Sequence, residues 1–114
     1  MKYTHNISDK ILHLHFEGDL IGENNGAELV EIVKDAIDKQ VSLCALYIED
    51  VRYINSSGIG VLITILTKFR NKGGEVVLVN PSDHVKKLLV ITKLNAIFSI
   101  VDSETEAIEK LKKS

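Results

Sequence analysis

The sequence predicts an α/β domain with a mixed central sheet and about four helices, mainly on one side of it. Apolar runs of strand length alternate with segments of helical spacing, in the order ββαβαβαβα. Strands that alternate with helices pair in parallel through right-handed crossovers, whereas two strands in direct succession form a hairpin. With 45% apolar and 26% charged residues and no linker or repeat, we expect one domain over residues 1–114.

The N-terminal segment predicts a β-hairpin. In the run ILHLHF at 11–16, apolar residues alternate with His13 and His15, which is the period of a strand with one buried face. Residues 1–8 are expected to pair with this run. His13 and His15 then point the same way, and two imidazoles can share a metal. Because no third ligand is placed nearby, we expect solvent-facing histidines and no metal site.

The next elements are an amphipathic helix and two interior strands. Segment 24–39 carries apolar residues at helical spacing, with an acid early and a lysine late to suit the helix dipole. The runs LCALYI at 43–48 and EVVLVN at 75–80 are nearly continuous in apolar residues, as expected of covered strands. The single cysteine, Cys44, lies in the first run, so we expect an inert core thiol.

The C-terminal third predicts two more helices and a strand. Asn80-Pro81 is typical of a helix start with proline at the first helical position, and apolar spacing continues to Leu94. AIFSIV at 96–101 predicts a short strand. The sequence SETE at 103–106 spells a capping box, which indicates a final helix with a lysine-rich end.

Composition excludes several classes of function. The formal net charge is −2, and only six residues are aromatic (three Tyr, three Phe), so a nucleic-acid partner is not expected. The N-terminus lacks the apolar run of a secretory signal, and no apolar stretch approaches the ~20 residues that span a bilayer. We therefore expect a cytoplasmic protein without membrane insertion.

The most informative stretch is YINSSGIG at 53–60, which precedes an expected helix from about Ser57 to Lys72. Ser56 or Ser57 stands where a helix N-cap belongs, and an ordinary cap is one interpretation. Gly58 and Gly60 are poor helix formers at the end where backbone N–H groups are free, which indicates that something needs close access there.

The apolar residues of this helix predict which face meets the sheet. Val61 and Ile65 lie to the side of the apolar stripe that is expected to face the sheet. They form either part of a partner surface or part of a core helix with slightly more apolar residues than its packing requires. The stripe itself is expected to consist of Ile59, Leu62, Ile63, Leu66 and Phe69.

Three ligand-binding or catalytic interpretations of this stretch fail or are weak. A dinucleotide fingerprint needs a third glycine where Ile63 stands, a Walker loop needs a Gly-Lys-Ser/Thr triplet, and a nucleophile elbow needs glycine at position 55, where this chain has Asn55. A modified serine remains, because free helix N–H groups hold a phosphate and its charge alters a nearby docking surface.

The chain resembles the STAS domain family of anti-sigma-factor antagonists and sulphate-transporter tails. The resemblance covers nearly the whole chain. It is carried by the segments FEGDLI at 16–21, ALYIEDVRYINSSGIGVLI at 45–63, KGGEVVLVNPS at 72–82 and VKKLLVITKLNAIFSI at 85–100.

The resemblance implies a STAS-type fold and a partner switch. In stand-alone antagonists, an anti-sigma-factor serine kinase phosphorylates a serine at this helix start and a PP2C-type phosphatase removes the phosphate. The unphosphorylated antagonist binds the kinase. By position that serine is Ser57, with Ser56 as second choice. The partner-binding residues implied are Asp19, Asn55, Ser56, Ser57, Gly58, Ile59, Val61 and Ile65.

Two positions depart from the family pattern. Asn55 replaces an aspartate, and Ile21 stands where many antagonists have an acid, so two acids near the serine are neutral. The resemblance implies no enzymatic activity, cofactor or metal, and we expect a monomer. The alternative function is a constitutive soluble STAS subunit of a lipid-transport ABC system, in which the same surface holds an ATPase subunit without a phosphate cycle.

Overall fold

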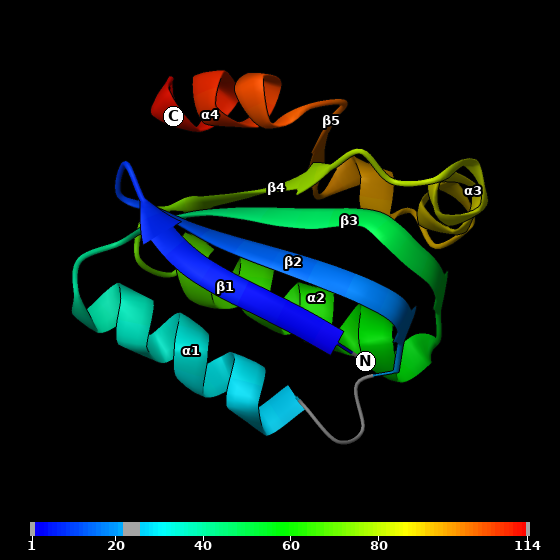
Figure 1. Ribbon diagram of the computed structural model, residues 1–114, viewed down its shortest axis with the longest axis horizontal. Helices are drawn as coiled ribbons and strands as arrows, with labels where there is room; N and C mark the ends of the chain where they lie inside the picture. The colour runs from blue at the N-terminus through cyan, green and yellow to red at the C-terminus, as the bar shows by residue number, and fades with distance from the viewer. Residues whose placement is uncertain (1, 22–25, 114) are drawn as a thin grey trace.

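The computed structural model describes residues 2–21 and 26–113, and it confirms the predicted order of elements. Five strands and four α-helices alternate after an initial hairpin (Figure 1). The elements are β1 (Lys2–Ser8), β2 (Ile11–Leu20), α1 (Gly26–Asp38), β3 (Leu43–Ile54), α2 (Ser56–Arg70), β4 (Glu75–Val79), α3 (Asp83–Ile91), the 3-10 turn η1 (Leu94–Ala96), β5 (Ser99–Val101) and α4 (Glu104–Lys112).

The sheet is mixed, as predicted, with the strand order β1-β2-β3-β4-β5. Only β1 runs antiparallel to its neighbour, and the other pairs are parallel. The hairpin turn consists of Asp9 and Lys10, which have φ angles of 56° and 63°. Positive φ at both turn residues matches the twist of the flanking strands. The expected hairpin is therefore present.

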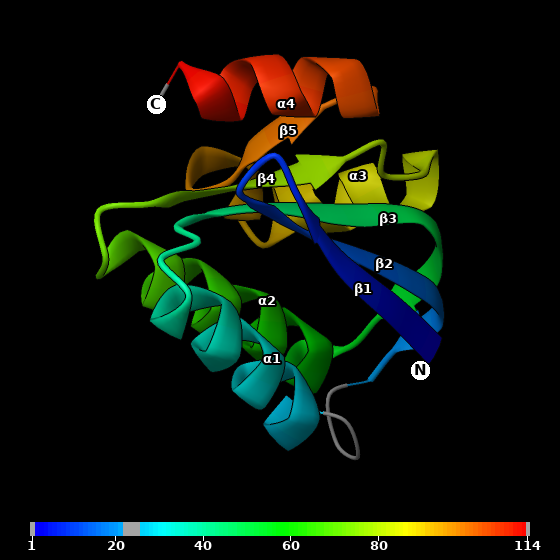
Figure 2. The ribbon, with the colours of Figure 1, turned by 60° about the vertical axis from the view of Figure 1, so that its left-hand side comes forward.

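Helices lie mainly on one side of the sheet, as predicted. α1 and α2 cover one face and α4 lies alone on the other, as Figures 1 and 2 show. The larger core receives buried side chains from α1, α2 and α3, and it includes Cys44, which is fully buried as expected. Burial raises the pKa of the Cys44 thiol. The smaller core joins Ala107 and Leu111 of α4 to the sheet.

The start of α3 differs in detail from the prediction, whereas the cap of α4 agrees with it. α3 begins after Ser82, whose side chain accepts a hydrogen bond from the N–H of Val85, so Pro81 precedes the cap and is not the first helical residue. At α4 the expected cap is present, because Ser103 accepts from the N–H of Glu106 at 3.2 Å. The Glu106 carboxylate accepts from the N–H of Asp102.

The expectation that His13 faces solvent is wrong. Its side chain is only 5% exposed, and its Nδ1 lies 2.8 Å from the Tyr47 hydroxyl oxygen. His15 lies on the same face and is exposed. The alternating pattern located the face correctly, but Tyr47 of β3 covers His13 on it. Within residues 2–21 and 26–113, no group of three His, Cys, Asp or Glu side chains is placed to hold a metal ion.

The helices that the structure describes are all too short or too polar to span a lipid bilayer.

Candidate functional site

The candidate site is the first turn of α2, which follows the end of β3 (Figure 1). There β3 remains paired with the end of β2, beyond its last pair with β4. The N–H of Asn55 donates to the carbonyl oxygen of Leu20 at 3.3 Å, which ties the start of the helix to the end of β2. α2 begins at Ser56, so Ser57 lies within one residue of the helix start, as predicted.

Asn55 is the N-cap, and neither serine is. Its backbone is extended, and its side-chain oxygen accepts a hydrogen bond from the N–H of Gly58 at 2.8 Å. Asparagine caps as well as aspartate does, so the neutral residue preserves this contact. Ser56 and Ser57 are the first two helical residues, and both are exposed.

The serine hydroxyls are therefore not engaged in capping. No hydrogen bond of the Ser57 side chain to any described residue occurs. An α-helix leaves its first four N–H groups without intrahelical partners, and Asn55 takes the one on Gly58. The N–H groups of Ser56 and Ser57 lie at the positive end of the helix dipole. This arrangement favours an anion at the Ser57 hydroxyl.

The two glycines have different structural roles. Gly58 is buried, and a Cβ at this position would overlap the carbonyl oxygen of Leu20. Its lack of a side chain therefore serves packing of α2 against β2, and the expectation that it opens the surface to a partner is wrong. Gly60 is exposed, and a Cβ there would meet nothing within 4 Å. The lack of a side chain at Gly60 therefore leaves the surface beside the serines open to a partner, as expected.

The predicted apolar stripe of α2 is rotated relative to the structure. Ile65 is fully buried, so it belongs to the core and cannot bind a partner. Ile63, expected in the core, is 38% exposed. Ile59 and Val61 are partly buried and pack against the larger core, so each keeps only part of its surface for contacts.

Asp19 lies on the neighbouring strand end and is paired with a cation. Its carboxylate is 3.5 Å from the Arg52 guanidinium, and both side chains remain accessible. Gly18, with φ of 80°, and a register shift after it turn the end of β2 at this point. Asp19, Arg52 and Ile21 line a shallow hollow of about 440 Å³.

Two exposed apolar side chains lie beside the site, and neither was predicted from the sequence as apolar surface. Tyr53 is 47% exposed at the end of β3, and Ile21 is 39% exposed after β2. The signal was available for Tyr53, because the two-residue period of a strand places it opposite the buried Ile54. The helix start is thus flanked by apolar surface.

Comparison with protein families matches residues 3–107 to the STAS domain. A Thermotoga maritima protein named "Putative anti-sigma factor antagonist" is 28% identical over 111 residues, covering 97% of this chain and 98% of that one. A crystal structure of a protein of that description from T. maritima has a TM-score of 0.81 at 27% identity, covering 96% of this chain and 94% of the other.

A more distant likeness supports the same fold. The anti-sigma factor antagonist SpoIIAA in its unphosphorylated form has a TM-score of 0.76 at 18% identity, covering 97% of this chain and 98% of that chain. Its phosphorylated form, from Bacillus, has a TM-score of 0.71 and covers 96% and 98% of the two chains. With a family match over nearly its whole length, this chain belongs to the STAS domain family.

Proposed function

We propose that this domain is a cytoplasmic anti-sigma-factor antagonist that switches partners through phosphorylation of Ser57. The unphosphorylated domain binds an anti-sigma-factor serine kinase, and a PP2C-type phosphatase restores that form. The domain itself supplies no catalytic group. The names of its relatives support antagonism of an anti-sigma factor as the general role.

The observation that carries the switch is the exposed Ser57 beside a separate N-cap. Because Asn55 caps the helix, the Ser57 hydroxyl is available to a kinase without loss of a structural hydrogen bond. A phosphate on Ser57 is stabilised within the domain by the helix dipole and the free N–H groups. The fold therefore tolerates both states.

The same phosphate opposes partner binding. Val61 lies one turn along α2 from Ser57, on the same side of the helix. Tyr53, Ile59 and Ile63 add apolar surface at the end of β3 and on α2. A partner that covers them must remove water from the phosphate, and a buried unpaired charge costs several kcal/mol. Since each 1.4 kcal/mol is a tenfold change in affinity, partial burial is sufficient for about a hundredfold loss.

The test measures binding of the purified anti-sigma-factor kinase of the same organism by titration calorimetry. Ser57→Ala is expected to bind like wild type, and Ser57→Asp about a hundredfold more weakly. Thr67→Asp is the matched control, because it adds the same charge at an exposed position of α2 that lies more than two turns beyond the helix start. Mass spectrometry of the kinase product distinguishes Ser57 from Ser56.

Equal affinity of wild type, Ser57→Ala and Ser57→Asp contradicts the switch. Persistent binding of all three by a transporter ATPase subunit instead supports the constitutive role in a lipid-transport ABC system.

A further inference from the structure

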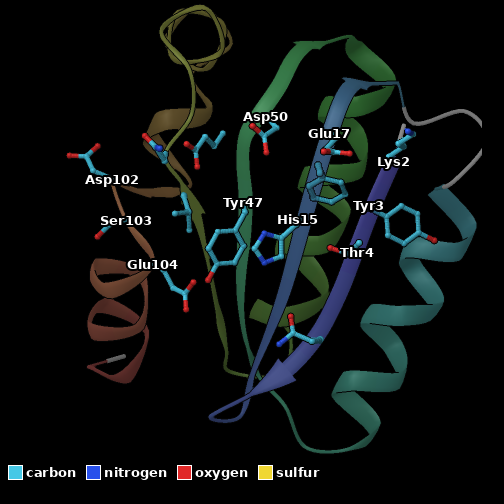
Figure 3. Close-up of a pocket in the computed structure, with 15 residues that line it drawn as sticks. Lys2, Tyr3, Thr4, His15, Glu17, Tyr47, Asp50, Asp102, Ser103 and Glu104 are labelled. Atoms are coloured by element: carbon cyan, nitrogen blue, oxygen red, sulfur yellow. The ribbon is translucent and has the colours of Figure 1, made fainter.

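The sheet face opposite α1 and α2 carries a groove that the proposed switch does not use. α4 packs mainly on β3, β4 and β5 and covers the start of β2 at Ile11. Farther along, Thr4 of β1 and His15 of β2 remain exposed on this side. Between the start of α4 and β1 lies a groove of about 1060 Å³ (Figure 3). This volume is at the upper end of the range of ligand sites in proteins.

The floor of the groove is a pair of stacked rings. His15 of β2 and Tyr47 of β3 are parallel within 7°, with ring centroids 4.0 Å apart, and Figure 3 shows them side by side. The Tyr47 hydroxyl is held by the buried His13 Nδ1 at 2.8 Å. The stacked pair, His15 and Tyr47, is therefore a fixed aromatic platform.

The rim of the groove is strongly acidic. The groove is lined by five carboxylates and by one amine. Within the described part of the chain, none of these five carboxylates forms a salt bridge, whereas Asp19, Glu75 and Asp9 elsewhere each do. Burial, and then the charge of Glu104, raise the pKa of Tyr47 to about 12, which indicates that the negative field reaches the platform. The six rim residues are Glu17, Glu49, Asp50, Asp102, Glu104 and Lys2.

We propose that this groove binds an extended, arginine-bearing segment of a protein partner. A guanidinium group is planar, so it stacks on aromatic faces and also forms paired hydrogen bonds with carboxylates. The platform and its rim offer both contacts within one groove. Nucleic acid and other anions are repelled by the same carboxylates.

The dimensions of the groove fit an extended peptide. Its lining residues come from β1, β2, β3, β4 and the start of α4. Four neighbouring strands span roughly 14 Å, at about 4.8 Å per strand, and an extended chain crosses that distance in about four residues. A segment with arginine at alternate positions places successive guanidinium groups on the same side of the chain, toward the floor.

The groove and the start of α2 lie on different faces, and only the end of the groove at Lys2 and Glu17 adjoins the hollow beside Asp19. This inference therefore does not rest on the proposed switch. Binding at the groove is expected to be the same for wild type and Ser57→Asp.

The test is an NMR titration of the ¹⁵N-labelled domain at low salt with the acetylated, amidated peptide Arg-Ser-Arg-Ser-Arg. The backbone amide signals of His15, Tyr47 and Glu49 are expected to shift. The peptides Lys-Ser-Lys-Ser-Lys and citrulline-Ser-citrulline-Ser-citrulline separate charge from planarity, and both are expected to bind more weakly than the arginine peptide.

Paired variants decide whether the groove itself is responsible. Glu49→Gln with Glu104→Gln is expected to weaken the arginine peptide roughly tenfold. Glu31→Gln with Glu109→Gln removes the same charge from exposed positions outside the groove and is expected to leave affinity unchanged. Equal weakening by both double variants, equal binding of the arginine and lysine peptides, or signal shifts confined to other surfaces each overturns the proposal.

Discussion

The side-chain oxygen of Asn55 accepts a hydrogen bond from the backbone N–H of Gly58 at 2.8 Å, which makes the asparagine the cap of α2 and leaves the adjacent serines free for other chemistry. Asn55→Ala is expected to lower the free energy of unfolding by about 1 kcal/mol. Asn55→Asp keeps the acceptor and adds a charge that the helix dipole favours, so no loss is expected. Urea denaturation measures both.

Ser57→Ala is the control for the cap. The Ser57 side chain is exposed and makes no capping hydrogen bond, so the free energy of unfolding is expected to change by no more than about 0.5 kcal/mol. A loss in Ser57→Ala as large as that in Asn55→Ala shows that the cap is assigned to the wrong residue.

Gly58 and Gly60 are expected to respond oppositely to alanine. A methyl group at Gly58 overlaps the Leu20 carbonyl, a backbone group that moves only with the strand, so Gly58→Ala is expected to cost about 1–3 kcal/mol or more. At Gly60 there is open space and the helix gains propensity, so Gly60→Ala is expected to stabilise by about 0.5–1 kcal/mol. Thermal unfolding of the two variants is the measurement. Destabilisation of both to the same extent contradicts the distinction.

Ile65 and Ile63 provide a test of the helix orientation. Ile65→Ala removes fully buried methyl groups and is expected to cost about 2–5 kcal/mol. Ile63→Ala is expected to cost well under half of that, because its side chain is partly in water, and to weaken the kinase complex instead. Denaturation of the free domain and calorimetry of the complex separate the two effects. The orientation is wrong if Ile63→Ala is the more destabilising substitution.

Tyr47 makes stability sensitive to alkali. Its folded pKa is raised to about 12 by burial and then by Glu104, whereas a tyrosine in an unfolded chain titrates near 10. The folded state therefore holds its proton over a range in which the unfolded state loses it, and the contribution to stability, complete below about pH 10, declines as the pH rises toward 12. Tyr47→Phe is expected to remove this part of the decline.

The phenolate absorbance of wild type minus that of Tyr47→Phe gives the midpoint directly. A difference curve centred near pH 10 contradicts the raised pKa.

The succession of elements could be predicted from the sequence because each strand and helix has its own period, and the caps at Ser82 and Ser103 lie next to the predicted boundaries. The face that α2 turns toward the sheet could not be predicted. This helix carries apolar residues on most of its circumference between 59 and 66, so periodicity alone selects no unique face. The contact of Gly58 with Leu20, which joins residues far apart in the sequence, fixes the rotation.

The predictions of the N-cap residue and of an exposed His13 failed for related reasons. Asn55, Ser56 and Ser57 are all good N-caps, and only the backbone angles of the folded chain choose among them. His13 has the polar position of an alternating strand, but its burial depends on Tyr47 of another strand. The position of Ser57 at the exposed start of a helix could be predicted from the motif, because it depends only on the local sequence.

The strand order β1-β2-β3-β4-β5 repeats the order of the strands along the chain. Each strand therefore pairs with the one synthesised just before it, and no strand has to insert between two that are already paired. During synthesis the sheet can grow at a single edge as the chain leaves the ribosome, and each crossover helix can dock beside the strands it connects. Pairing between successive strands keeps the loops that must close as short as a mostly parallel sheet allows, which limits the time for which unpaired strand edges are open to aggregation.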